Sequence, residues 1–114
     1  MQKIKRPKSI KSTKRDIEVG CGTLHVIMGS HEDKLIEVIA TLGKSGGCAS
    51  SQIEALGRSI SLGLRWGIPV EDYIEQLKDI RCPNPVVGPG SSVCLSCSDG
   101  FSKALEEEIF EKTT

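Results

Sequence analysis

The chain has few aromatic residues, no long apolar run and no net charge, and these absences exclude several classes of protein. Its aromatic residues are one Trp, one Tyr and two Phe, fewer than a protein that binds nucleic acid through stacked bases needs. No apolar run approaches the roughly 18 residues that span a bilayer, and no signal-peptide core follows the N-terminus. With 114 residues, the chain is too short for a large catalytic scaffold such as a (β/α)8 barrel. We therefore expect a cytoplasmic, single-domain protein without a membrane segment.

The net charge of zero conceals an uneven distribution along the chain. Of the 15 Lys and Arg residues, seven lie within residues 1–15, whereas all 15 acidic residues come later, so the rest of the chain has a net charge of minus seven. We expect residues 1–13 to form a basic arm and residues 14–114 to form the folded domain. Such charge blocks are usually solvated and flexible. The arm could instead contact phosphate or an acidic partner, or fold back onto the acidic body.

The spacing of apolar residues predicts an α+β fold. Residues 14–43 alternate polar and apolar positions with short polar connections, which is typical of a three-stranded antiparallel meander. From Cys48 the apolar spacing becomes helical. Gly67 would end this first helix, Pro69 would begin a second, and Ser98 would be the N-cap of a third. Small residues would let another backbone approach the first helix closely: Gly57, Ser59, Ser61 and Gly63.

The glycine-rich connection between the last strand and the first helix is a candidate anion site. Glycines allow backbone N–H groups to point into one concavity, and the helix start adds its positive dipole end. It is not a P-loop, because Val38 stands where the first glycine would be needed. The alternative is a turn that simply requires small residues. The candidate ligand-binding residues are Lys44, Ser45, Gly46, Gly47, Ser50 and Ser51, with Arg58 and Arg81 as additions of unknown direction.

Five cysteines and two histidines are the remaining candidates for chemistry. An odd number of cysteines without a secretion signal argues against a disulfide framework. Cys94 and Cys97, with Cys82 and either Cys48 or Cys21, could form a four-thiolate structural zinc site. Inert buried thiols and a redox pair are the two alternatives. His25 and His31 have no nucleophile signature nearby, so we expect no enzymatic activity.

Several segments together resemble the TSCPD domain family. They are Cys21–Val26, Gly43–Arg58, Ile80–Pro83 and Leu95–Asp99. The last of these matches the motif that names the family, except that Ser98 stands where the family has proline. The resemblance covers roughly residues 17–108. It places Cys21, Cys48, Cys82 and Cys97 at the recurring cysteine positions of the family, which makes them the candidate zinc ligands, and it leaves Cys94 as an extra.

The resemblance implies an accessory role, because TSCPD domains occur at the C-terminus of cobalamin-dependent ribonucleotide reductases and as free-standing small proteins. The barrel that performs the radical chemistry is absent here. One expected function is a non-catalytic module that binds a nucleotide or another phosphorylated small molecule. It would act as an accessory subunit or sequester a nucleotide-derived signal, as small viral anti-defence proteins do. The alternative is a cysteine-based zinc or redox module that serves a reductase partner.

Self-association is a further expectation from the predicted sheet. Leu24, Val26 and Met28 alternate with His25 and Ile27, so both faces of the sheet carry apolar residues. A small sheet that is covered on one face leaves its other face and its edges open. We therefore expect a symmetric homodimer.

Overall fold

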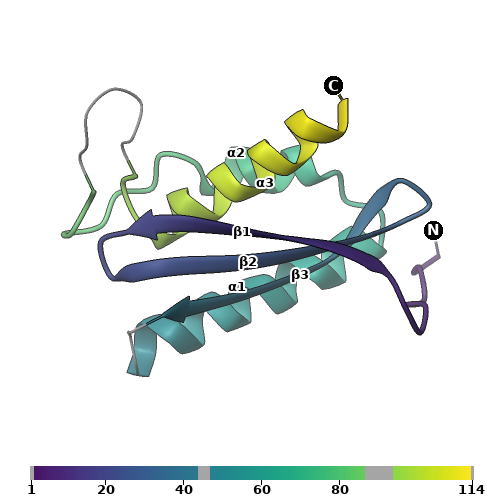
Figure 1. Cartoon of the computed structure of the whole chain (residues 1–114), viewed down its shortest axis with the longest axis horizontal. Coiled ribbons are helices and arrows are strands. Elements are labelled where there is room, and N and C mark those ends of the chain that lie inside the picture. The colour runs from purple at the N-terminus through teal and green to yellow at the C-terminus, as the bar shows by residue number, and fades with distance from the viewer. Residues whose placement is uncertain (1, 44–46, 87–93, 114) are drawn as a thin grey trace.

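The computed structural model describes residues 2–43, 47–86 and 94–113 of the chain. Three strands form one antiparallel sheet in the order β1-β2-β3, and three helices follow them in the sequence (Figure 1). The strands are β1 (Lys11–Val19), β2 (Gly22–His31) and β3 (Lys34–Gly43). The helices are α1 (Gly47–Arg65), α2 (Val70–Leu77) and α3 (Cys97–Thr113). The predicted α+β fold, a meander packed with three helices, is confirmed.

The structure adds two details to the predicted meander over residues 14–43, at the start of β1 and in the turn between β2 and β3. β1 begins at Lys11 rather than at residue 14, because residues 11–13 pair in register with Met28, Gly29 and Ser30 of β2. The turn between β2 and β3 consists of Glu32 and Asp33, whose φ angles are 52° and 63°. Two consecutive left-handed residues match the right-handed twist of the strands that they join.

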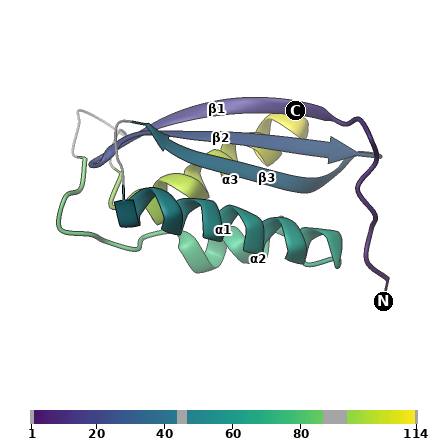
Figure 2. The same ribbon diagram turned by 90° about the horizontal axis from the view of Figure 1, so that it is seen from below.

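All three helices cover the same face of the sheet, as Figure 2 shows from below. The inner face of β2 contributes Leu24, Val26 and Met28, and all three are buried. They belong to one apolar core with Ile60 of α1 and Phe101 of α3. Burying side chains of this size contributes about 1.5–3 kcal/mol each, so this face holds the fold together. None of the described helices covers the opposite face of the sheet.

Helix α1 packs against the outer edge of β3 through small residues. The Ser61 hydroxyl accepts a hydrogen bond from Val38 N at 2.8 Å and donates one to Val38 O at 2.9 Å. A Cβ added at Gly57 would lie 3.2 Å from Val38 O and 3.4 Å from Ala40 N. Of the four small residues predicted to allow close packing, Gly57 and Ser61 bring α1 onto the β3 backbone, whereas Gly63 faces Tyr73 and Ser59 is exposed. Ser61 satisfies edge groups that would otherwise need water.

The C-terminal end of α1 is closed by its own loop and by the N-terminal arm. Gly67 N donates to Leu64 O and Ile68 N donates to Gly63 O, and Gly67 has a φ of 98°. This pattern is a Schellman motif, so the predicted helix end at Gly67 is confirmed.

Within the described residues, no helix is both long enough and apolar enough to cross a bilayer.

Candidate functional site

The predicted phosphate loop lies only partly within the described residues. Lys44, Ser45 and Gly46 lie outside them. Gly47 is the first residue of α1, and the first turn of this helix contains no acidic residue. Ser50 is half-buried and Ser51 is exposed. The Ser51 hydroxyl donates a hydrogen bond to Cys48 O at 3.0 Å, so one of the two predicted hydroxyl donors is already engaged by its own helix.

Both predicted arginines, Arg58 and Arg81, are exposed. Arg58 is exposed and pairs with Glu54, with 2.9 Å between Nη2 and Oε2. It lies 11 residues after Gly47, about 16 Å along the helix axis at 1.5 Å per residue. That separation removes Arg58 from a site at the helix start. Arg81 is exposed in the connection that follows α2, and it has no recorded ion pair within the described part of the chain.

Cysteines gather at the end of the molecule where α1 and α3 begin and where β1 turns into β2 (Figures 1 and 2). Cys82 N donates to Leu95 O at 3.0 Å, and the Asn84 side-chain amide donates to Gly20 O at 2.8 Å. These bonds hold the segment around Cys82 between the β1–β2 turn and the start of α3. The thiols of Cys97 and Cys21 are themselves hydrogen-bonded.

The zinc site predicted from Cys21, Cys48, Cys82 and Cys97 stays a prediction. Among the residues that the structure describes, no three His, Cys, Asp or Glu side chains are arranged to hold a metal ion. Two of the sulfur atoms make hydrogen bonds to the protein itself. Cys82 Sγ accepts a hydrogen bond from Asn84 N at 3.3 Å, and the buried Cys94 thiol donates to Ser96 O at 3.3 Å. Cys48 is exposed in the first turn of α1.

The environment of Cys97 also weakens the redox interpretation. Burial, followed by the neighbouring Cys21, raises the pKa of the Cys97 thiol to about 11. Burial likewise raises the pKa of Cys94. Because the thiolate is the reactive form, both side chains are neutral, poorly reactive thiols at neutral pH.

The segment Leu95–Asp99 is a structural junction around one buried carboxylate. The Asp99 side chain accepts hydrogen bonds from Asp79 N at 2.8 Å and from Leu95 N at 2.9 Å, and Lys103 Nζ lies 3.6 Å away. Asp99 N in turn donates to the Ser96 hydroxyl at 3.0 Å. Asp99 therefore connects the end of α2 with the start of α3.

This geometry corrects the predicted N-cap of α3. The cap is Ser96 and not Ser98, because it is the Ser96 hydroxyl that accepts the N–H of the third helical residue. The spacing Ser96-x-x-Asp99 resembles a capping box, in which a Ser and an acidic residue three positions later serve the helix start together. The Ser96-x-x-Asp99 spacing is visible in the sequence and could have identified Ser96 as the cap. In a complete capping box the acidic side chain accepts the backbone N–H of the cap residue. Here the Asp99 carboxylate accepts the N–H groups of Leu95 and Asp79 instead.

A model of the TSCPD domain family matches residues 2–109. The chain belongs to the TSCPD domain family. The match begins nearer the N-terminus than the resemblance over residues 17–108, and it includes the basic arm. No solved structure matches the chain. In this TSCPD domain, the residues at the naming motif form the buried junction of α2 and α3.

The opposite end of the TSCPD domain contains two cavities beside the β2–β3 turn. One has a volume of 530 Å³ and is lined by residues that include Lys11, Thr13, His31 and Glu108. The other, of 380 Å³, lies between Ile4 of the arm and the start of α2. Asp33 and Glu108 line both cavities. Lys11 lines the first cavity and Lys34 the second, and Glu108 is paired with Arg15 at 3.1 Å, so both cavities contain charges of both signs.

One side-chain pair on the open face of the sheet was missed by the sequence analysis. His25 Nδ1 and Asp16 Oδ1 are 2.7 Å apart, because the β1–β2 register places the two residues opposite each other. The hydrogen bond from His25 lowers the pKa of Asp16. The other ring nitrogen, Nε2, would lie 3.1 Å from a Cβ added at Gly43, so glycine at this position leaves room for the imidazole ring.

Proposed function

We propose that this TSCPD domain is a non-catalytic module that binds a phosphorylated small molecule of the nucleotide type. The observation that carries the proposal is the start of α1. This 19-residue helix has no acidic residue in its first turn and follows a glycine-rich segment that contains Lys44 and Ser45. The N–H groups of a first helical turn lack intrahelical partners, and together with the helix dipole they favour an anion.

The distribution of charge supports the same place for an anion. The chain after residue 15 is net acidic, so a phosphate needs a local positive feature in order to bind. The start of α1 is one such feature, and Lys44 is the cation nearest to it in the sequence. The phosphorylated ligand would contact the backbone of Ser45, Gly46 and Gly47 and the Lys44 side chain. Ser50 would add a hydroxyl donor.

Calorimetry against a panel of nucleotides, including cyclic nucleotides and ADP-ribose-type compounds, tests this proposal. A charge-assisted hydrogen bond contributes roughly 1.5–3 kcal/mol, so Lys44→Ala should weaken binding by roughly ten- to a hundredfold. Gly46→Val should also weaken binding, because a branched side chain would enter the concavity. Lys34→Ala, which removes an exposed lysine in β3, is the matched control. If Lys44→Ala and Gly46→Val both bind the ligand like the wild type, the site is elsewhere.

A second candidate function is a cysteine-based module that serves a ribonucleotide reductase. It is favoured by the contact between Cys21 and Cys97 and by the position of Cys82 beside them. The purified protein separates the two candidates, since a bound nucleotide absorbs in the ultraviolet and zinc is found by elemental analysis. Protein that contains no zinc, and whose melting temperature is unchanged by Cys82→Ser, would exclude a metal-based function.

A further inference from the structure

The basic arm is docked on the body of the domain. Ile4 N donates to Arg65 O, in the last turn of α1, at 2.8 Å. Arg6 binds the Glu37 carboxylate of β3 through two hydrogen bonds of 2.6 and 3.3 Å. Ile4, Pro7 and Ile10 are half-buried, whereas the basic residues between them are exposed. The arm therefore runs from α1 to the sheet and presents its cations to solvent.

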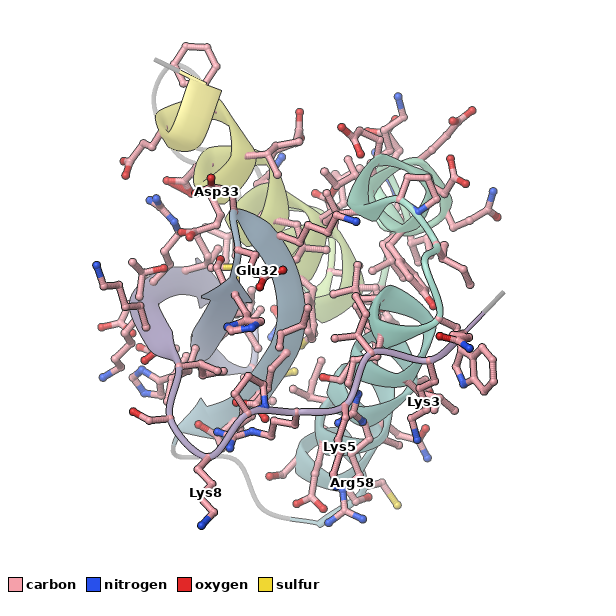
Figure 3. The ribbon with its side chains drawn as sticks, turned by 90° about the vertical axis from the view of Figure 1, so that its right-hand side faces the viewer. Lys3, Lys5, Lys8, Glu32, Asp33 and Arg58 are labelled. Carbon is pink, nitrogen blue, oxygen red and sulfur yellow. The ribbon has the colours of Figure 1, made fainter. Side chains whose placement is uncertain are left out.

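Four cations of the basic arm have no ion pair among the described residues. The structure records ion pairs for Arg6, Lys14 and Arg15, but none among the described residues for Lys3, Lys5, Lys8 or Lys11. Lys11 belongs to β1, whereas Lys3, Lys5 and Lys8 precede the sheet. An extended chain covers at most about 3.6 Å per residue, so Lys3 and Lys8 lie no more than about 18 Å apart. They form a short row, as Figure 3 shows, and Glu32 and Asp33 lie apart from it.

The single tryptophan of the chain lies at one end of this row. Trp66 follows Arg65, whose carbonyl holds Ile4, and its side chain is 41% exposed. Arg58 is seven residues before Arg65, so it lies on the same side of α1, about 10 Å back along the axis. Figure 3 shows Arg58 on the side of the molecule where Lys3 and Lys5 lie. Arg58 is paired with Glu54, so the uncompensated charge of this surface comes from the lysines of the arm, and the exposed indole lies beside them.

We propose that this surface, formed by Lys3, Lys5, Lys8 and Trp66, binds a short single-stranded segment of nucleic acid. Lysines that lack partners attract successive phosphates, and an exposed indole stacks with a base of any sequence. The chain has too few rings for a protein that stacks several bases, so the surface offers one stacking position and the lysines supply the rest of the binding. The acidic body and the Glu32–Asp33 turn repel further phosphates, which limits the bound segment to a few nucleotides.

A structural role for the arm does not account for these features. Cations near the C-terminal end of α1 would interact favourably with its dipole, and Arg6 neutralises Glu37. Neither role requires three further lysines without partners beside an exposed indole. An acidic peptide would use the lysines but offers no planar base to the ring. The surface is also separate from the proposed nucleotide site, because Gly47 and Arg65 are 18 residues apart, about 27 Å along α1.

The emission of Trp66 reports directly on this surface, since the chain contains one Trp. We expect a ten-nucleotide oligothymidylate to quench it. With three phosphates neutralised, the single-strand salt slope is about −2, so raising the salt from 50 to 200 mM should weaken binding roughly twentyfold. An oligomer of the same length without bases should bind about tenfold more weakly, because it cannot stack on the indole.

Charge-reversal variants identify the residues, with binding followed by the anisotropy of a labelled oligothymidylate. The double variant Lys3→Glu, Lys5→Glu should bind at least tenfold more weakly. Lys8→Glu, outside the segment that contacts α1, should bind several-fold more weakly, and Trp66→Ala about tenfold. Lys78→Glu, an exposed lysine after α2, is the control and should change binding less than twofold.

Two results would overturn the proposal. One is that polyglutamate of equal length binds as tightly as oligothymidylate and quenches Trp66 equally, which would identify an acidic protein segment as the partner. The other is that oligothymidylate binds the wild type and the double variant alike while their melting temperatures agree. Comparing melting temperatures for every variant ensures that lost binding is not lost folding.

Discussion

At the scale of single residues, Asp99 shows how a motif that looks chemical can be structural. Its side chain is 2% exposed, yet it accepts two backbone N–H groups and lies near Lys103. Burial alone would raise the pKa of this carboxyl group. The hydrogen bonds from Leu95 and Asp79, together with Lys103, outweigh burial and lower the pKa below its usual range. The carboxylate is therefore charged in the folded state and joins three segments.

Replacing Asp99 should destabilise the fold in a pH-dependent manner. Asp99→Asn leaves one part-buried N–H without its acceptor, which costs about 1 kcal/mol. Folding lowers the pKa of Asp99, so the charged carboxylate stabilises the folded state. This stabilisation is fully present above the pKa of an unfolded Asp, which is about 4. It is lost as the pH falls through the lower pKa that Asp99 has in the folded state. Chemical denaturation measures the free energy of unfolding of wild type and variant at pH 7 and at pH 3. The difference between the two proteins should be smaller at pH 3. Asp72→Asn, an exposed site in α2, is the control, and an equal difference at both pH values would contradict the prediction.

At the scale of elements, the contact between α1 and β3 decides how the sheet edge is protected. An edge strand presents backbone groups that can pair with another chain. Here Ser61 occupies both the N–H and the C=O of Val38, and Gly57 allows the helix to approach closely. β3 is thus a covered edge, and its cover depends on the small size of these two residues.

Ser61→Ala should therefore destabilise the domain by about 1–3 kcal/mol, since it leaves the Val38 N–H buried without an acceptor. Ser59→Ala on the exposed side of the same helix is the matched control and should change the free energy of unfolding by less than about 0.5 kcal/mol. Urea denaturation of both variants measures the difference. Equal stabilities would show that Ser61 does not hold the edge.

At the scale of the whole molecule, the open face of the sheet is the surface that we expect to support a homodimer. Ile27 and Ile39 are 38% and 48% exposed and are register partners in neighbouring strands. Burying them against a second copy would remove apolar surface from water. Light scattering at micromolar concentration should give twice the mass of the 12.3 kDa chain, and Ile39→Lys should shift the protein towards the monomer. A wild type that scatters only as a 12.3 kDa species would contradict this expectation.

The local features of this protein were determined by its sequence alone. Alternation over residues 14–43 predicted the meander, helical spacing after Cys48 predicted α1, and Gly67 predicted its end. These signals are local, because each depends on the period of a strand or helix or on one residue's backbone preference. The TSCPD motifs added the family, which is confirmed over residues 2–109.

The arrangement of functional groups was decided only by the tertiary structure. Ser96 rather than Ser98 caps α3, and Arg58 lies far from the start of α1. The arm is held by a carbonyl of α1 and a carboxylate of β3, and no period in residues 1–13 specifies either partner. Such contacts join residues that are distant in the chain. Their geometry depends on how the helices pack on the sheet, which local spacing does not contain.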